Sequence, residues 1–187
     1  MKTSRKISAF AALLLIASLA FAQAPQAPKP APELQRLAYL AGDWKIEGTM
    51  QPSAFGSGGK FTSTDHTEWF AGKFFLVSHS DLSMTGMGTM KGMAIFGYDL
   101  QNKVYTYRAF NSIGQAQSST GTVQGADWTW TNDYTYQGKT YKNRFLLHED
   151  SPSAYSMKVD LSQDGGNTWK TVMEGNATRT SAATATP

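Results

Sequence analysis

The chain has 187 residues and no cysteine, so disulfide bonds, thiol chemistry and a lipid-modified cysteine are all excluded. Its 17 basic and 14 acidic residues give a net charge of +3. Three of the basic residues, Lys2, Arg5 and Lys6, lie at the extreme N-terminus, and without them 14 basic residues face 14 acidic ones. This balance removes the main electrostatic support for a nucleic acid or an anionic membrane as partner.

The first 22 residues have the pattern of a secretory signal peptide. A charged start is followed by an apolar run over residues 7–21, and Ala20-Phe21-Ala22 supplies the small residues of a cleavage site. The run of about 15 apolar residues is too short for a comfortable membrane span. We therefore expect a signal peptide over residues 1–22, export to the periplasm or the extracellular space, and no stable membrane insertion after cleavage.

The remaining chain divides into a tether, one domain and a tail. Residues 23–32, which read QAPQAPKPAP, predict an extended Ala/Pro-rich tether. Residues 180–187 lack hydrophobic periodicity and predict a disordered tail. The segment between them, residues 33–179, spans about 147 residues, which is the usual size of a single domain with a hydrophobic core.

This domain is predicted to begin with a short helix over residues 33–42. Leu34, Leu37 and Leu40 form an apolar stripe, and Gly42 stands where a C-terminal cap belongs. A helix of this length needs a surface to pack on. The rest of the domain therefore has to provide that surface.

Ten strand-like segments follow the helix. They are rich in Thr, Tyr, Trp, Phe and Val, and Gly, Asn, Asp and Pro punctuate the links between them. Hairpin-length links favour an antiparallel meander, and closure into a barrel removes its exposed edges. We expect an all-β domain: a single antiparallel up-and-down barrel of about ten strands, at residues 43–51, 60–70, 73–83, 89–100, 103–112, 115–124, 126–136, 139–149, 154–162 and 168–179.

Two sets of residues carry a resemblance to known barrels. Leu40-Ala-Gly-Asp-Trp44 is similar to the opening of calycin barrels, the superfamily of lipocalins and fatty-acid-binding proteins. In lipocalins this tryptophan closes one barrel end beneath a basic residue of the last strand, which implies such structural roles for Trp44 and Arg179. The segments at 69–77 and 91–99, Gly121 and the Asp-Gly-Gly-x-Thr-Trp hairpin resemble the bacterial domain-of-unknown-function family 1579. The resemblance implies a calycin-like barrel and brings no established catalytic residue.

The sequence from Ser162 to Trp169 fits the Asp-box pattern Ser-x-Asp-x-Gly-x-Thr-Trp, which is familiar from sialidase propellers. A propeller needs several blades, and a single box in a chain of this size does not supply them. We expect a structural role instead: Asp164 accepts hydrogen bonds in a tight hairpin, and Trp169 packs under its loop.

Two histidine–carboxylate pairs flank the expected turn at Ala71-Gly72. In a strand, residues two apart share a face, so His66 points with Glu68 and His79 points with Asp81. A two-residue turn places both histidines on the same face, whereas a three-residue loop places them on opposite faces. No tight ligand spacing supports a metal, so no metal site is predicted and no residue is assigned as catalytic.

Four methionines, at positions 84, 87, 90 and 93, recur at a spacing of three. Thioether sulfur is a soft ligand that suits Cu(I). In a strand this spacing sends Met84 and Met90 to the face opposite Met87 and Met93, so the four sulfurs cannot converge on one ion without an irregular loop. We expect flexible filling of a barrel mouth, and any Cu(I) binding would use Met84 and Met87.

Three functions remain open on this sequence. The favoured one is a binding module for a small, partly apolar molecule, and the others are an envelope enzyme with a histidine–carboxylate cluster and a structural or stress-related envelope protein without a ligand. No cofactor is expected, and no oligomeric state is predicted. An inward Arg108 could hold a ligand carboxylate, whereas an outward one would lie on a solvated face. The predicted cavity residues are Trp69, Phe75, His66, His79, Tyr98, Tyr107 and Arg108.

Overall fold

A computed structural model describes residues 28–53, 56–86 and 88–182, so the predicted signal peptide lies outside the described residues. No helix in these ranges is long and apolar enough to cross a membrane. The elements are a 3₁₀ helix η1 (Pro32–Leu40) and strands β1 (Gly42–Met50), β2 (Gly59–Trp69), β3 (Leu76–Met84), β4 (Gly88–Asp99), β5 (Val104–Asn111), β6 (Ala116–Gln124), β7 (Asp127–Tyr136), β8 (Lys139–Ser151), β9 (Ala154–Ser162) and β10 (Lys170–Ala182).

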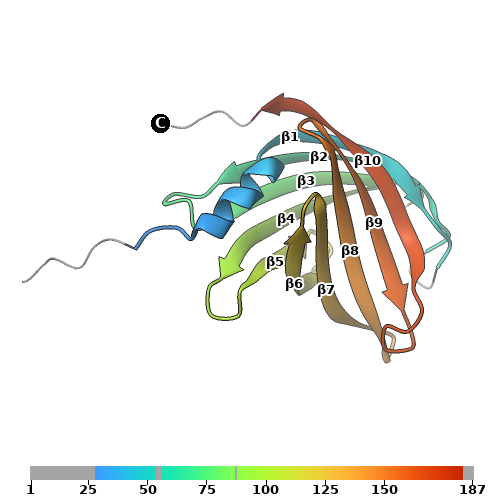
Figure 1. The fold of residues 1–187 in the computed structure, drawn as a ribbon. Helices are drawn as coiled ribbons and strands as arrows, with labels where there is room; N and C mark the ends of the chain where they lie inside the picture. The colour runs from blue at the N-terminus through green and yellow to red at the C-terminus, as the bar shows by residue number, and fades with distance from the viewer. Residues whose placement is uncertain (1–27, 54–55, 87, 183–187) are drawn as a thin grey trace, which may run out of the picture.

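The ten strands form a closed antiparallel barrel with up-and-down connections (Figure 1). Each strand pairs with its neighbours in the chain, and β1 closes the ring because it pairs with both β2 and β10. The predicted all-β barrel of about ten strands with a short N-terminal helix is therefore confirmed. Closure leaves no strand among these ten with an unpaired edge, which is the physical advantage of the barrel.

The helix lies across one end of the barrel and supplies the apolar plug of that end (Figure 1). It has 3₁₀ geometry and ends at Leu40, whereas Gly42 already begins β1 with a positive φ of 113° instead of capping the helix. Leu34, Leu37 and Leu40 are all buried in the same apolar cluster as Trp44 and Trp128. The barrel end thus provides the surface that the short helix needs.

The strand boundaries differ from the expected ones at two places. β3 begins at Leu76 and not at residue 73, because the backbone N–H of Phe70 donates to the carbonyl of Phe75 and closes a longer loop. Lys73 in this loop has a positive φ of 59°, which a strand does not allow. β10 continues to Ala182, beyond the expected domain end at Arg179, because Gly42 pairs with Ala182 in the first ladder.

Arg179 and Trp44 form a latch at the end of the barrel that η1 covers. The guanidinium carbon of Arg179 lies 4.2 Å from the centroid of the Trp44 ring. The same guanidinium donates to the backbone carbonyls of Tyr39, at 2.7 Å, and of Ala41. The Trp44 indole N–H in turn donates to the Leu40 carbonyl at 2.9 Å. Charge, aromatic ring and helix C-terminus thus hold one another in place.

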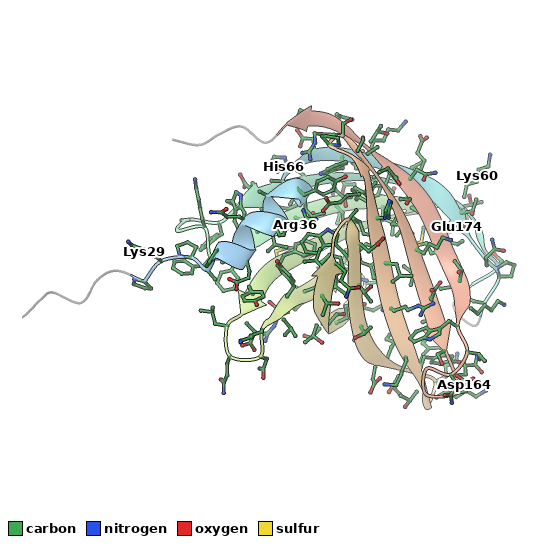
Figure 2. All side chains as sticks on the ribbon, viewed as in Figure 1. Lys29, Arg36, Lys60, His66, Asp164 and Glu174 are labelled. Carbon is green, nitrogen blue, oxygen red and sulfur yellow. The ribbon has the colours of Figure 1, made fainter. Side chains whose placement is uncertain are left out.

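The β9–β10 hairpin lies at the end of the barrel opposite η1, with Asp164 at its tip (Figure 2). The Asp164 carboxylate accepts hydrogen bonds from the Thr168 hydroxyl at 2.6 Å, from the Thr168 backbone N–H at 2.9 Å and from the Ser162 hydroxyl at 2.7 Å. The Trp169 indole N–H donates to the Gly166 carbonyl at 3.0 Å, and the Trp169 ring stacks on Arg144. The single Asp box is therefore a folded hairpin within a barrel.

Candidate functional site

The interior of the barrel holds a cavity of about 500 Å³. Because side chains alternate across a strand, every second residue of each strand faces this interior. Most of the wall is apolar or aromatic, including Phe61, Phe96, Phe145 and Leu147. The end of the barrel opposite η1, here called the mouth, is bordered by Met50, Met84, Met90, Ile113 and Met173.

A polar strip runs along the inner faces of β2 and β3 and interrupts this apolar wall. It consists of Ser63, Asp65 and Thr67 on β2 and of Ser78 and Ser80 on β3, all of which line the cavity. Thr67 donates to the Ser78 hydroxyl at 2.9 Å, and Ser63 donates to the Asp65 carboxylate at 2.5 Å. The strip gives the mostly apolar cavity one continuous polar side, and the amides of Gln115, Gln117 and Asn143 add polar groups elsewhere on the wall.

Asp65 is the one carboxylate among the described residues that line this cavity, and none of those lining residues is Lys, Arg or His. Burial raises the pKa of the Asp65 carboxyl, and the hydrogen bond from Ser63 opposes part of that rise. No ion pair within the described ranges involves Asp65. The carboxylate therefore lies in the barrel without a positive partner, which is an energetically costly placement.

Two tyrosine side chains line the same cavity, and the charge of Asp65 contributes to the pKa of both. Burial, and next the Asp65 charge, raise the pKa of the Tyr107 hydroxyl to about 12. The same two causes, in that order, raise the pKa of Tyr155, and Tyr39 and Tyr107 raise it further. The Tyr155 ring lies 4.8 Å from the ring of Trp44, and Trp44 is the β1 residue paired with Asp65 in β2. Asp65, Trp44 and Tyr155 thus belong to one region of the wall.

An aromatic stack forms another part of the wall. Trp130 stacks on Trp128, with ring centroids 5.2 Å apart, and on Phe145, at 5.6 Å. The Trp130 indole N–H is buried and has no hydrogen-bond partner among the described residues. Gly121, its neighbour across β6 and β7, has no side chain and so leaves room for the ring. This packing makes the wall rigid on the side of β7 and β8.

The methionine pattern is partly explained by this arrangement. Met84 and Met90 line the cavity, and Met93 points outward with 38 % of its surface exposed. This division between Met90 and Met93 is the alternation expected of a strand. Met87 lies outside the described residues, so the expectation that any Cu(I) binding would use Met84 and Met87 stays a prediction. At the mouth, unbranched thioether side chains provide an adaptable apolar rim.

The structure distributes the predicted cavity residues over three places. Tyr107 lines the cavity. Trp69 and Tyr98 pack against the apolar cluster beneath η1. The remaining four side chains are exposed and lie on the outer face of the barrel. Each is one residue away from a side chain that points inward, and neighbouring side chains of an extended segment point to opposite faces. These four are Phe75, His66, His79 and Arg108. Whether any of the seven contacts a ligand stays a prediction.

The two histidines lie opposite each other on neighbouring strands, since His66 pairs with His79 in the β2–β3 ladder. They share a face, and the loop between their strands is longer than the two- or three-residue alternatives. Nδ1 of His66 lies 2.5 Å from the Asp43 carboxylate, which raises the pKa of His66. Within the described ranges no group of three or more His, Cys, Asp or Glu residues is placed to hold a metal ion.

The alternation of residues in β2 could have predicted that Asp65 points into the barrel. Phe61 and Trp69 are the aromatic residues of β2 and have the same strand parity as Asp65, so an inward Phe61 implies an inward Asp65. His66 then has to point outward. The same reasoning predicts the orientation of Arg108: Tyr105 and Tyr107 lie on the inner face of β5, so Arg108 lies on the outer face.

Comparisons with known proteins agree with this architecture. The chain is similar to the crystal structure of Rv2717c from M. tuberculosis, with 12 % sequence identity and a TM-score of 0.56, over 82 % of this chain and 100 % of that one. At this identity the likeness shows the fold alone. A comparison with curated proteins gives no match. A family model described as "Protein of unknown function (DUF1579)" matches residues 29–179. The chain therefore belongs to the DUF1579 family of proteins of unknown function.

Proposed function

We propose that this protein is a binding module that holds a small, partly apolar molecule inside its barrel. The observation that carries the proposal is the interior cavity of about 500 Å³ with its mostly apolar wall and a few polar groups, most of them in the strip on β2 and β3. Ligand pockets typically measure ~300–1,000 Å³ and combine an apolar lining with a few polar groups that orient the ligand. The cavity of this barrel has both properties.

The distribution of residues favours a binder over an enzyme of the histidine–carboxylate type. His66 and His79 are exposed on the outer face of the barrel and border an open surface depression with Asp81 and Lys91. The cavity wall itself carries hydroxyls, amides, one carboxyl and aromatic rings, without a histidine among the described lining residues. Such a wall suits the recognition and shielding of an apolar molecule.

The proposal also covers the place of action. We propose that binding takes place outside the cytoplasm, in the periplasm or the extracellular space, because residues 1–22 have the pattern of a signal peptide. N-terminal sequencing of the protein from culture fractions tests this. A mature chain that begins at Gln23 supports export, and a cytoplasmic chain that retains residues 1–22 contradicts it.

Binding can be tested with Nile red, a neutral dye whose fluorescence rises in apolar surroundings. We expect the wild-type protein to bind the dye with a saturable signal. Met90→Trp places a larger side chain on the cavity wall at the mouth and should weaken dye binding about tenfold or more, because it removes space that the ligand occupies.

The matched control is Met93→Trp. It makes the same replacement in the same strand, but at a position that points outward. We expect unchanged dye binding in this variant. Equal effects of the two substitutions, or no saturable binding in the wild type, would contradict the cavity as the binding site. Native mass spectrometry of protein from its own host gives an independent answer, since a bound molecule should be released on denaturation.

A further inference from the structure

We propose that the ligand is a cationic amphiphile: a molecule with a positively charged nitrogen that binds Asp65 and an apolar chain that occupies the rest of the barrel. This inference rests on the proposed function and names the ligand class of the same cavity. It follows from the charge inventory of the wall, from the hydrogen bonds of Asp65 and from the aromatic rings beside it.

The charge inventory of the cavity favours a cation over an anion. Asp65 is the single formally charged side chain among the described lining residues. The arginines that could have served a ligand carboxylate point elsewhere: Arg108 is exposed on the outer face, and Arg144 pairs with Asp160 at 2.8 Å. A fatty acid would therefore bring a second negative charge to Asp65 and find no positive partner on the wall, which is unfavourable at low dielectric.

The Asp65 carboxylate retains free hydrogen-bonding capacity. A carboxylate offers about four lone-pair sites, and the described hydrogen bonds to Asp65 number one, from the Ser63 hydroxyl at 2.5 Å. An ammonium group carries three N–H donors and no acceptor, so it complements an acceptor-only group. The hydroxyl of Ser80, which is paired with Asp65 across β2 and β3, lies on the same wall and offers a further acceptor.

Aromatic rings lie beside the carboxylate. Trp44 is the β1 partner of Asp65, and its ring contacts that of Tyr155 with centroids 4.8 Å apart. Both residues line the cavity. The faces and hydroxyls of such rings attract organic cations, more so where water is displaced. The Arg179 guanidinium already lies over the Trp44 ring. Tyr155 and Tyr107, which both line the cavity and are both within range of the Asp65 charge, are therefore the aromatic side chains available to a substituted ammonium group.

The part of the wall formed by β8 and β9 matches an apolar chain. Strands β8 and β9 contribute Phe145, Leu147, Met157, Val159 and Leu161 to the lining. These side chains offer no strong hydrogen-bonding group to a polar ligand, and a hydrocarbon chain in contact with them is favoured because both apolar surfaces are removed from water. A cation at the β2–β3 strip and a chain along β8 and β9 use both halves of the cavity.

The burial of Asp65 also favours the binding of a cation. A carboxylate withdrawn from water and left without a positive partner destabilises the folded state, and burial accordingly raises the pKa of Asp65. A ligand ammonium group supplies the missing charge and removes that penalty. The penalty in the empty protein thus becomes a contribution to affinity in the complex.

The test is displacement of Nile red by three amphiphiles of equal chain length, used below their micelle concentrations: dodecylamine, dodecanol and dodecanoate. We expect dodecylamine to bind about tenfold more tightly than dodecanol, a difference of ~1.4 kcal/mol, because its ammonium group forms charge-assisted hydrogen bonds with Asp65. Dodecanoate should bind more weakly than dodecanol. In Asp65→Asn the amine and the alcohol should bind alike.

The control variant is Glu68→Gln, which removes a carboxylate from the same strand on the outer face. It should keep the wild-type preference for the amine. Asp65→Ser, which puts a third serine beside Ser63 and Ser80, repeats the measurement with a second replacement and should also lose the preference.

The outcomes separate this inference from the proposed function. Saturable Nile red and dodecanol binding without a preference for the amine, or a preference that survives in Asp65→Asn, overturns the cationic ligand and leaves the binding module intact. No saturable binding of Nile red or of any of the three amphiphiles overturns the binding module, and the cationic ligand with it.

Discussion

The guanidinium of Arg179, in the last strand, lies over the indole ring of Trp44, in the first, at 4.2 Å from the ring centroid. Because the guanidinium also donates to the carbonyls of Tyr39 and Ala41, it joins β10, β1 and η1 at one end of the barrel. Arg179→Ala leaves these partly buried carbonyls without their donor, removes the contact with the Trp44 ring, and should lower the free energy of unfolding by about 2–4 kcal/mol. Urea unfolding measures this.

Arg108→Ala is the matched control for that measurement, because Arg108 is exposed in β5. A surface substitution of this kind changes stability by about 0.5 kcal/mol or less. If both alanine variants unfolded at the same urea concentration, the latch would have no energetic role, and the closing interaction would have to be sought elsewhere.

The helix plug can be tested in the same assay. Leu37 is fully buried, whereas Leu100, in the β4–β5 turn, is 66 % exposed. Leu37→Ala removes the same atoms from the plug that Leu100→Ala removes from the surface. We expect a loss of about 2–5 kcal/mol for Leu37→Ala and little change for Leu100→Ala. A small loss at Leu37 would indicate that η1 is not needed to close the barrel.

The strand order and most strand boundaries could be predicted from the sequence, because they depend on local composition and on short links. Each of the ten predicted segments overlaps one of β1 to β10. Within β5, Tyr105 and Tyr107 lie on one face and Arg108 on the other, as the two-residue period of a strand requires. Closure followed from the need to pair the two edge strands.

The hairpin at residues 70–75 could not be predicted in the same way, because its length depends on one backbone hydrogen bond, from Phe70 to Phe75, and on a positive φ at Lys73. The set of residues that line the cavity could not be predicted from local sequence patterns either. Asp65 and His66 are adjacent polar residues in one strand, and only the facing strands decide which of them meets an apolar interior. That decision is a property of the closed barrel and not of the segment.

A substitution at Gly121 can test how tightly the aromatic stack around Trp130 is packed. A Cβ atom at this position would lie 2.7 Å from the Trp130 indole nitrogen and closer still to the ring carbon beside it. Gly121→Ala therefore has to displace a ring that is stacked between Trp128 and Phe145, and overpacking of this kind costs about 1–3 kcal/mol. Thr122→Ala, at the exposed neighbouring position, should change stability by about 0.5 kcal/mol or less. Thermal unfolding of the two variants compares them directly.

The Asp164 hairpin predicts a dependence of stability on pH. Hydrogen bonds from the Thr168 hydroxyl and backbone, and then from Ser162, hold the pKa of Asp164 well below its usual range. A lowered pKa in the folded state stabilises the fold above the unfolded pKa of about 4, and this contribution is lost as pH falls further. Asp164→Asn should therefore lower the melting temperature at pH 7 and have a smaller effect at pH 2.

The control for the hairpin is Asp133→Asn, which removes an exposed ion pair with Lys142. Such a pair contributes little to stability, so this variant should melt close to the wild type at both pH values. A deficit of Asp164→Asn that was equal at pH 7 and pH 2 would show that its carboxylate charge is not what stabilises the hairpin.

For Asp65 we expect the opposite dependence of stability on pH. Burial raises the pKa of its carboxyl in the folded protein, against the opposing hydrogen bond from Ser63. A raised pKa means that the folded state binds this proton more tightly than the unfolded state. The corresponding stability is present below about pH 4, the unfolded value, and is lost as pH rises through the folded one. The ligand-free Asp65→Asn variant should therefore be more stable than the wild type at pH 7 and close to it at pH 3.

Dodecylamine provides the second half of this prediction. If an ammonium group neutralises Asp65, saturating amine should raise the melting temperature of the wild type at pH 7 more than that of Asp65→Asn, because only the wild type carries the buried charge. Glu68→Gln, which alters an exposed carboxylate of the same strand, should respond like the wild type. A wild type that is more stable than Asp65→Asn at pH 7 without ligand would show that the carboxylate contributes to folding, and that its position in the barrel needs no ligand to explain it.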